Sequence, residues 1–332
     1  MSYTLAVGKA ARAHGWRWSR PAGTLGKSEG ETMQDRHIGD VRVTRIEEIS
    51  GPGFPAKDFF PEFEPETFKS HEHWMAPGYY QPESGRLIRS IHSWLIRTGK
   101  HTILVDACSG NHKNRPGMPG FHMLDTKYLD RLREAGVAPE EVDFVMCTHL
   151  HVDHVGWNTR LENGKWVPTF PNARYVMSRV DHDHWAKVAK TSGSPEYEVN
   201  TYNDSVLPIV EAKMAEFVAG GEHAMCGCLK LKPAPGHTPG QIRIDLESKG
   251  KRAMFPGDAL HSPLQVPVWR WNSRFCDDRD LAAKTRGALL ADCAEQGALL
   301  MPAHFGSPHA AYIKAKGDRF ELDWDHDNAR GR

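Results

Sequence analysis

The 332-residue sequence lacks two features that would each point to a particular class of protein. No run of apolar residues approaches the ~20 that a membrane-spanning helix needs, so no membrane is expected as a partner. Neither sign of charge is in excess, because 42 lysines and arginines balance 42 aspartates and glutamates. This balance gives no reason to expect nucleic acid or an acidic surface as a partner.

Cysteine is scarce, and its positions do not form a disulfide framework. The six cysteines are Cys108, Cys147, Cys226, Cys228, Cys276 and Cys293, and none belongs to a Cys-x-x-Cys motif. Scattered cysteines without a framework are typical of a reducing compartment. We therefore expect a cytoplasmic protein.

Residues 1–34 are poor in periodic apolar residues and rich in glycine, alanine and basic side chains. The segment lacks the apolar core of about 7–15 residues that a signal peptide requires. We expect a disordered N-terminal extension over residues 1–34 and one domain over residues 35–332. Met33 is a candidate for the true start.

Residues 51–83 contain many prolines and aromatic residues. Proline at this density disfavours regular helix or sheet. The segment is predicted to be a long loop, serving either as a lid over the functional site or as a subunit contact in a homodimer.

Elsewhere the apolar pattern predicts alternating strands and helices, which indicates an α/β protein. Strands are expected at residues 41–46, 91–96, 102–105, 142–147, 165–170, 173–177, 229–232, 241–246, 252–255 and 299–301. Helices are expected at residues 125–135, 181–190, 206–217 and 281–295. The charged tail from Lys314 carries no clear pattern.

Residues 148–157 carry four candidate metal ligands in the pattern His-x-His-x-Asp-His. They directly follow the apolar run at residues 142–147, which reads as a buried strand. His149 and His151 are two residues apart, so on extended chain they project to the same side. Asp153 and His154 follow in a turn and could reach a second ion. Zinc suits this imidazole and carboxylate set, and iron and manganese remain open.

This segment resembles the signature of the metallo-β-lactamase superfamily of metallohydrolases. The family's other ligands have matches downstream, in the family's order. They are His237 in Gly-His-Thr-Pro-Gly, Asp258 in Gly-Asp, and His304 in Pro-Ala-His. The resemblance covers roughly residues 40–310 and implies a four-layer αββα sandwich.

The resemblance also implies a role for each ligand. His149, His151 and His237 would hold one zinc ion, Asp153, His154 and His304 a second, and Asp258 would bridge them. A hydroxide shared by the two ions would attack an electrophilic centre. Asp153 would also relay a proton to the leaving group as a catalytic residue. Asp106, at the end of a strand, would orient the metal-binding loop without binding metal.

Among the functions found in this family, hydrolysis of a lactone or another small ester is our first hypothesis. A phosphotriesterase and a hydrolytic dehalogenase of an activated chloroaromatic remain as alternatives, because the same hydroxide would serve all three. A member that binds metal without catalysis is the alternative of another class. Asp258 stands where some β-lactamases of the family have cysteine, which disfavours that subclass.

Candidate pocket residues lie beside the ligand motifs in sequence. They are Trp157, His261, Gln265, Trp269, Trp271 and Phe305. Together they suggest an aromatic pocket, with His261 as the best candidate for substrate contact. Residues 181–184 read Asp-His-Asp-His, but neighbours on a helix point about 100° apart, so we do not expect a second metal site there.

Overall fold

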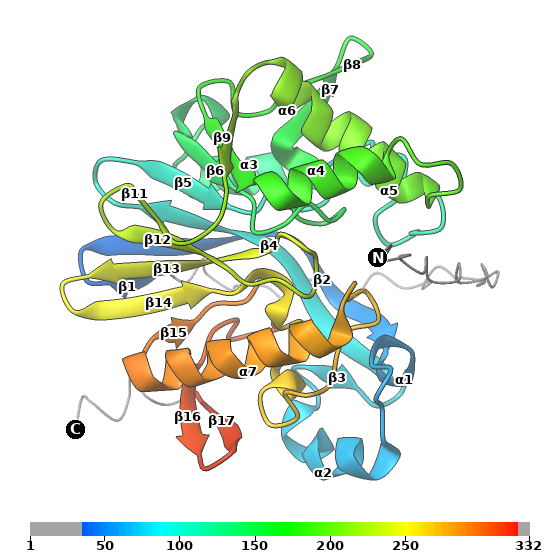
Figure 1. Ribbon diagram of the computed structural model, residues 1–332, viewed down its shortest axis with the longest axis vertical. Helices are drawn as coiled ribbons and strands as arrows, with labels where there is room; N and C mark the ends of the chain where they lie inside the picture. The colour runs from blue at the N-terminus through cyan, green and yellow to red at the C-terminus, as the bar shows by residue number, and fades with distance from the viewer. Residues whose placement is uncertain (1–34, 325–332) are drawn as a thin grey trace, which may run out of the picture. The chain divides into compact units, whose positions relative to one another are not determined.

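The strands assemble into two β-sheets that face each other, with helices outside both (Figure 1). The computed structural model describes residues 35–324. The predictions about residues 1–34 and about Met33 therefore lie outside the described residues.

The first sheet has eight strands in the order β1-β2-β4-β5-β6-β9-β10, with β3 paired to β4. Pairs from β1 to β5 are antiparallel, whereas β5, β6, β9 and β10 run parallel. The strands are β1 (Asp35–Ile38), β2 (Val41–Pro55), β3 (Tyr80–Gln81), β4 (Arg86–Arg97), β5 (Thr102–Val105), β6 (Phe144–Met146), β9 (Arg174–Ser178) and β10 (Ala215–Val218).

The second sheet has five strands in sequence order, antiparallel except for the last pair. The strands are β11 (His223–Met225), β12 (Leu229–Pro233), β13 (Ile242–Ser248), β14 (Lys251–Phe255) and β15 (Leu299–Leu300). Two hairpins stand apart from the sheets: β7 (Thr159–Glu162) with β8 (Lys165–Pro168), and β16 (Tyr312–Lys316) with β17 (Arg319–Asp323).

Besides four short 3-10 helices, the described part contains seven α-helices and one π-helical turn, η3. They are α1 (Ala56–Phe59), α2 (Pro65–Met75), α3 (Tyr128–Glu134), α4 (Arg179–Val188), α5 (Glu196–Thr201), η3 (Tyr202–Val206), α6 (Leu207–Glu211) and α7 (Arg279–Gln296). Helices α3, α4 and α6 cover the first sheet, and α7 covers the second (Figure 1). The predicted four-layer αββα sandwich is confirmed.

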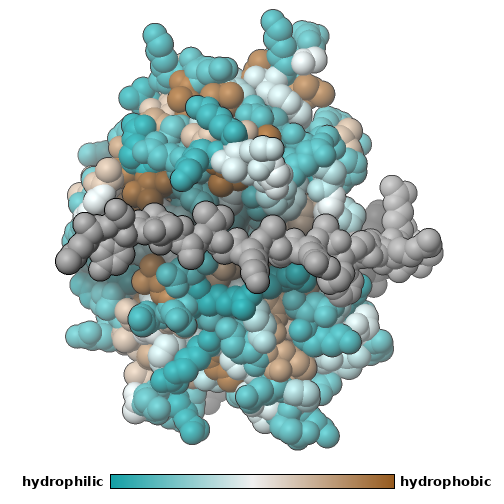
Figure 2. Space-filling view, turned by 45° about the vertical axis from the view of Figure 1, so that its right-hand side comes forward, coloured by the Kyte–Doolittle hydropathy of each residue, from teal (hydrophilic) through white to brown (hydrophobic). Residues whose placement is uncertain are grey.

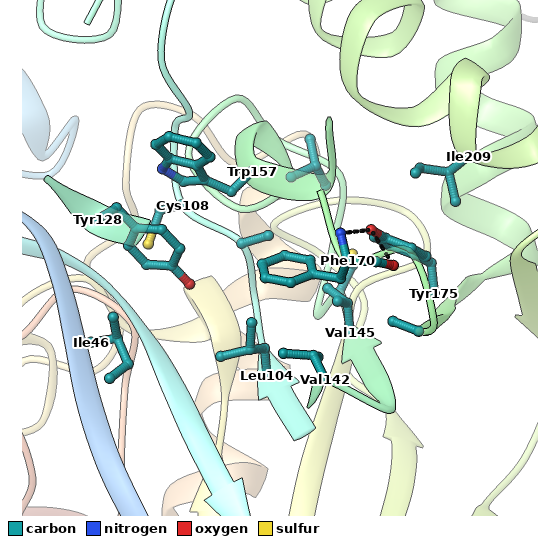
Figure 3. Close-up of a cluster of buried hydrophobic side chains, with 14 of the residues drawn as sticks. Ile46, Leu104, Cys108, Tyr128, Val142, Val145, Trp157, Phe170, Tyr175 and Ile209 are labelled. Carbon is teal, nitrogen blue, oxygen red and sulfur yellow. Dashed lines mark hydrogen bonds between the residues drawn. The ribbon is translucent and has the colours of Figure 1, made fainter. Parts of the chain in front are cut away.

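Alternating side chains supply a core on each face of the sheets. Val43 and Ile96 of the first sheet pack against Ile244 and Phe255 of the second. The neighbours of these residues point the other way, since successive side chains on a strand alternate between its two faces. Figure 3 shows that outer core, where Leu104 and other buried side chains lie beneath the helices.

Helix α7 illustrates how local sequence sets an element's bounds. Asp278 caps its N-terminus by accepting a hydrogen bond from the amide of Leu281 (2.9 Å). Gly297 ends it with a φ of 58°, a left-handed conformation that glycine adopts without steric cost. Leu289 and Leu290 are buried and pack the helix onto the second sheet.

The prediction that residues 51–83 lack regular structure was wrong. Strand β2 continues to Pro55, paired with Arg86, and α2 occupies residues 65–75. The pairing register of β2 with β4 shifts between Pro52 and Pro55. This irregularity accommodates the two prolines, which have no backbone N–H to donate to the neighbouring strand. Pro65 begins α2, where the missing amide hydrogen costs nothing.

The helix predicted over residues 206–217 was also wrong in its second half. Helix α6 ends at Glu211, and Lys213 has a φ of 58°. The chain then turns into β10, which pairs with β9 at the edge of the first sheet. That pairing is a long-range contact, so helical periodicity in the sequence could not reveal it. Within the charged tail, residues 314–323 pair as part of the β16–β17 hairpin.

In the described part of the chain, no helix combines the length and apolar character needed to cross a membrane. On the face in view, Figure 2 shows hydrophobic residues in small patches separated by hydrophilic ones. All six cysteines are free thiols.

Candidate metal centre

The His-x-His-x-Asp-His motif occupies the loop that leaves the C-terminal end of β6. The amide of Cys147 continues the strand pairing by donating to Val176 O (2.9 Å), and the motif begins just after it. His149 Nε2 and His151 Nδ1 lie 3.0 Å apart and face each other. The strand therefore delivers these two imidazoles to one point, as the spacing predicts.

His237 completes the first group of candidate ligands. Its Nε2 lies 2.9 Å from His151 Nδ1 and 3.4 Å from Asp258 Oδ2. The ligand atoms of His149, His151, His237 and Asp258 all lie within 4.8 Å of one another.

Asp153, His154 and His304 form the second group, with Asp258 beside it. His154 Nε2 lies 3.2 Å from His304 Nε2, and both of these nitrogens lie within 3.8 Å of an Asp153 oxygen. Asp258 Oδ1 faces this group, at 2.9 Å from His304 Nε2, while Oδ2 faces the first group. One carboxylate thus presents one oxygen to each group.

The donor set fits a pair of metal ions. Zinc–nitrogen bonds of about 2.0–2.1 Å at tetrahedral angles separate neighbouring nitrogens by roughly 3.3 Å. The nitrogen pairs described above lie 2.9–3.2 Å apart. Asp258 Oδ1 is buried, and the polar atoms beside it are the candidate ligand nitrogens His304 Nε2 (2.9 Å) and His154 Nε2 (3.2 Å). A buried carboxylate oxygen surrounded by imidazole nitrogens is suited to a shared cation.

Charges within the cluster shift several pKa values. Burial lowers the pKa of His149 well below its usual value. Burial acts the same way on His154, but the carboxylates of Asp258 and Asp106 outweigh it and raise the pKa well above the usual value. The pKa of His237 is raised to about 9, because Asp258 outweighs burial there too. The charged form of the buried Asp258 carboxylate is therefore stabilised by positive charge on its neighbours.

Asp106 holds the metal-binding loop, in the position that the resemblance implies. Its Oδ1 accepts a hydrogen bond from the amide of Thr148 (2.7 Å), and its Oδ2 lies 2.9 Å from His154 Nδ1. This contact leaves Nε2 of His154 as the nitrogen that faces the site. Gly257 gives the same loop room, since a Cβ there would lie 2.7 Å from Thr148 Oγ1.

Asp181 is a positioning residue that the sequence did not reveal. Its carboxylate accepts from the amides of Leu150 (3.2 Å) and Gly240 (2.7 Å) and from the hydroxyl of Thr238 (3.0 Å). It therefore ties the loop that carries His149 and His151 to the loop that carries His237. The sequence predicted no metal site at residues 181–184, and none of these residues belongs to either group of candidate ligands in the described part of the chain. The sequence did not predict that Asp181 is buried beneath the two ligand loops.

A cavity of about 270 Å³ opens onto both ligand groups. His151, Asp153, His237, Asp258 and His304 all line it. Most of the other lining side chains are aromatic or aliphatic; they include Phe54, Phe59, Leu87, Ile91, Met118, Phe121 and Phe275. Phe54 and Phe59 belong to the proline-rich segment, so that segment borders the site.

Of the six predicted pocket residues, only His261 lines this cavity, where its Nε2 lies 3.0 Å from Asp258 Oδ2. The other five predictions were wrong. Gln265 instead bonds the backbone at His261 and Trp271, and Trp157 donates to Glu48 (2.6 Å) while stacking on Tyr128. The remaining three pack into buried clusters or their margins; they are Trp269, Trp271 and Phe305. Large apolar side chains beside a ligand motif fill the core beneath the loop because burial favours them.

Comparison with known proteins supplies an independent observation. The sequence model of the family described as the metallo-beta-lactamase superfamily matches residues 87–323. An N-acyl homoserine lactonase of Bacillus sp is 24% identical over 167 residues, which are 47% of this chain and 58% of the relative. The chain thus spans less than two thirds of that relative.

Two solved structures share the fold over most of the chain. The hydrolase AbOPH, described as belonging to the beta lactamase superfamily, has a TM-score of 0.73 at 24% identity, covering 88% of this chain and 96% of its own. AidC, described as a dizinc quorum-quenching lactonase in complex with a product, has a TM-score of 0.70 at 20% identity, covering 87% and 96%.

Proposed function

Because the chain belongs to the metallo-beta-lactamase superfamily, we propose that it is a metal-dependent hydrolase of a small lactone or ester. The observation that carries this proposal is the position of Asp258, whose two oxygens face two separate groups of ligands. A single structural ion would need neither the second group nor a shared carboxylate.

We assign two zinc ions to these groups. The first would be held by His149, His151, His237 and Asp258, and the second by Asp153, His154, His304 and Asp258. When bound, such a pair lowers the pKa of water to near 7 and polarises a carbonyl group. The second group has two carboxylates and two imidazoles, so iron or manganese is an alternative occupant there.

Asp153 is assigned the proton transfer. Its carboxylate lines the cavity, and its side chain retains 15% exposure whereas that of Asp258 retains 4%. Hydrolysis adds the oxygen of water to the acyl carbon, breaks the ester C–O bond and leaves an alkoxide that needs a proton. A carboxylate at the cavity surface can take the proton of water and give it to that oxygen.

His261 is assigned to the substrate side of the centre. Burial lowers its pKa to about 4, so the imidazole is neutral near pH 7. Its Nδ1 is buried without a hydrogen-bond partner. A neutral imidazole at the cavity wall can donate to or accept from a polar atom of the substrate.

The cavity supports a small substrate. Its aromatic and aliphatic lining suits an acyl chain or a ring, and its volume of about 270 Å³ is near the lower end of ligand sites. The curated relative is named as an N-acyl homoserine lactonase, which agrees with a lactone. We further propose that the protein acts on its small-molecule substrate in the cytoplasm, where its six thiols would stay reduced.

The test is proton release at constant pH by zinc-loaded protein. The substrates are an acyl-homoserine lactone, an aryl ester, a phosphotriester and a chlorinated dinitrile arene. The matched control is the same protein after removal of metal by a chelator and after restoration with zinc. Release with the lactone or ester that disappears with the metal and returns with zinc supports the proposal. Release only with the phosphotriester or the arene would replace the substrate class, and no release with a full metal complement would refute catalysis on these classes.

A further inference from the structure

Arg89 on β4 lines the cavity, and no carboxylate of the described residues forms an ion pair with it. No hydrogen bond or ion pair of its guanidinium occurs among residues 35–324. Its neighbour Ser90 exchanges backbone contacts with His304, at 3.1 Å from the Ser90 amide to His304 O and 3.0 Å from His304 Nδ1 to Ser90 O. Arg89 therefore projects from a strand that is fixed directly to the metal centre.

The walls around Arg89 fit its side chain closely. Its guanidinium carbon lies 4.7 Å from the centre of the Phe121 ring. A Cβ added to Gly53 would lie 2.9 Å from Arg89 Cδ, and one added to Gly120 would lie 3.0 Å from Nη2. Two glycines and a phenyl ring thus form a slot for the arginine, which limits how far the guanidinium can move.

The nearby carboxylates are committed to other contacts. Burial lowers the pKa of Arg89, and Asp153 and Glu48 offset only part of that effect. Glu48 accepts hydrogen bonds from the amides of Ser109 (2.7 Å) and Gly110 (3.0 Å) and from the indole of Trp157. Asp153 belongs to the second ligand group. A negatively charged group that balances Arg89 would therefore have to come from a molecule bound in the cavity.

A second arginine of the lining has a different environment. Arg274 shares its part of the cavity with the carboxylates of Glu198 and Asp277, and the charges of both Arg274 and Asp277 act on neighbouring Tyr197. Those carboxylates disfavour an anion beside Arg274. Arg89 is therefore the better site for a negative group, and Arg274 offers a matched comparison.

We propose that Arg89 binds a carboxylate of the substrate, so that the preferred ester or lactone carries a negative charge away from the bond that is broken. This inference rests on the proposed hydrolase function. A single planar guanidinium pairs with one carboxylate through two parallel N–H···O bonds. Arg89 is partly buried among apolar side chains, where an unpaired charge is less well solvated than in water, so a ligand that neutralises it gains free energy that a neutral ligand does not.

The experiment compares two lactones of equal chain length with zinc-loaded protein. One is N-hexanoyl-homoserine lactone, and the other is N-adipoyl-homoserine lactone, in which a carboxylate replaces the terminal methyl group. Proton release gives kcat/KM for each. The wild type should prefer the adipoyl lactone by roughly 10- to 100-fold, the range of one charged hydrogen-bonded pair. Arg89→Met should bring the ratio to about one, Arg89→Lys should retain part of it, and Arg274→Met should retain it.

Binding separates this inference from the proposed function. The lactam analogues of both compounds, with NH in place of the ring oxygen, are titrated into zinc-loaded protein by calorimetry, with metal content checked for each variant. If neither lactone is hydrolysed, the lactone function fails, yet tighter binding of the adipoyl lactam that is lost in Arg89→Met still supports the carboxylate site. Equal or absent binding of the two lactams overturns the inference. A preference that is lost in Arg274→Met but kept in Arg89→Met also overturns it.

Discussion

The metal centre and the cavity wall meet at the same place but are built differently. The seven candidate ligands come from four short motifs, each at or just beyond a strand end, where the backbone fixes their direction. The wall is built from β2, α1, β4, the loop after β5, α4, α5 and the segment before α7. The residues of the wall come together because these segments pack against one another. Metal binding at the centre should therefore depend on a few side chains, whereas the shape of the wall should depend on the folding of whole segments.

The largest effect is expected at the residue that joins the two ligand groups. Asp258→Ala removes the oxygens that face both, so both ions should bind weakly and hydrolysis should fall by more than the ~10–100-fold typical of losing an outer partner of a ligand. Metal analysis after dialysis, with activity on the same samples, checks this. Full metal occupancy of both sites in Asp258→Ala would contradict the bridging assignment. It would also show that the centre does not depend on a single side chain.

A strong effect on the wall is expected from Asp204, which lies outside the metal centre. Its carboxylate makes two hydrogen bonds to buried Arg115 (2.6 and 2.7 Å) and lies 3.5 Å from buried Lys113. Both cations belong to the loop that supplies Met118 and Phe121 to the cavity. Asp204→Asn removes the negative charge that faces both side chains and should lower the free energy of unfolding by about 3–5 kcal/mol.

Denaturant unfolding measures that loss, and metal content provides the contrast. The folded Asp204→Asn protein should keep both ions, because none of the seven candidate ligands contacts Asp204. Loss of metal without loss of stability would show that centre and wall are not independent.

A smaller effect is expected when a ligand keeps its place but loses its support. Asp106→Asn weakens the contact to His154 Nδ1 and should lower metal affinity by roughly 10–100-fold, the usual cost of changing such a partner. Competition with a zinc chelator measures the affinity. The control is Asp106→Glu, which keeps the negative charge but moves the carboxylate. If Asp106→Asn binds zinc as tightly as the wild type, Asp106 does not orient His154.

No effect on metal content is expected at two histidines of α4. His182 contacts Asp183 and Tyr202, His184 lies 3.7 Å from Asp277, and neither belongs to a group of candidate ligands. His182→Ala and His184→Ala should each retain the wild-type zinc content in elemental analysis. If either variant lost half of its zinc, the substituted histidine of α4 would be part of the metal centre.

Much of the fold could be predicted from the sequence, and the failures share one cause. Helix α7 and the strand before the His-x-His motif follow from local signals, since caps and apolar periodicity act within a few residues. Strand β10 and helix α2 were missed. One depends on pairing with β9, and the other packs Phe68 and Met75 into a cluster with the distant Trp271. Such contacts leave no mark on nearby sequence.

The same division holds for the site. The spacing of residues in the sequence predicted His149, His151, Asp153 and His154 as candidate ligands, because metal binding requires particular side chains at fixed spacing along a strand and its turn. The resemblance to the family added four further residues by their motifs: His237, Asp258, His304 and the orienting Asp106. Only the tertiary structure decided that Asp181 joins two ligand loops, that Trp157 and Phe305 pack elsewhere, and that Arg89 enters the cavity unpaired. The physical reason is that a pocket wall is defined by which distant segments pack together, and packing accepts many sequences of similar shape and polarity.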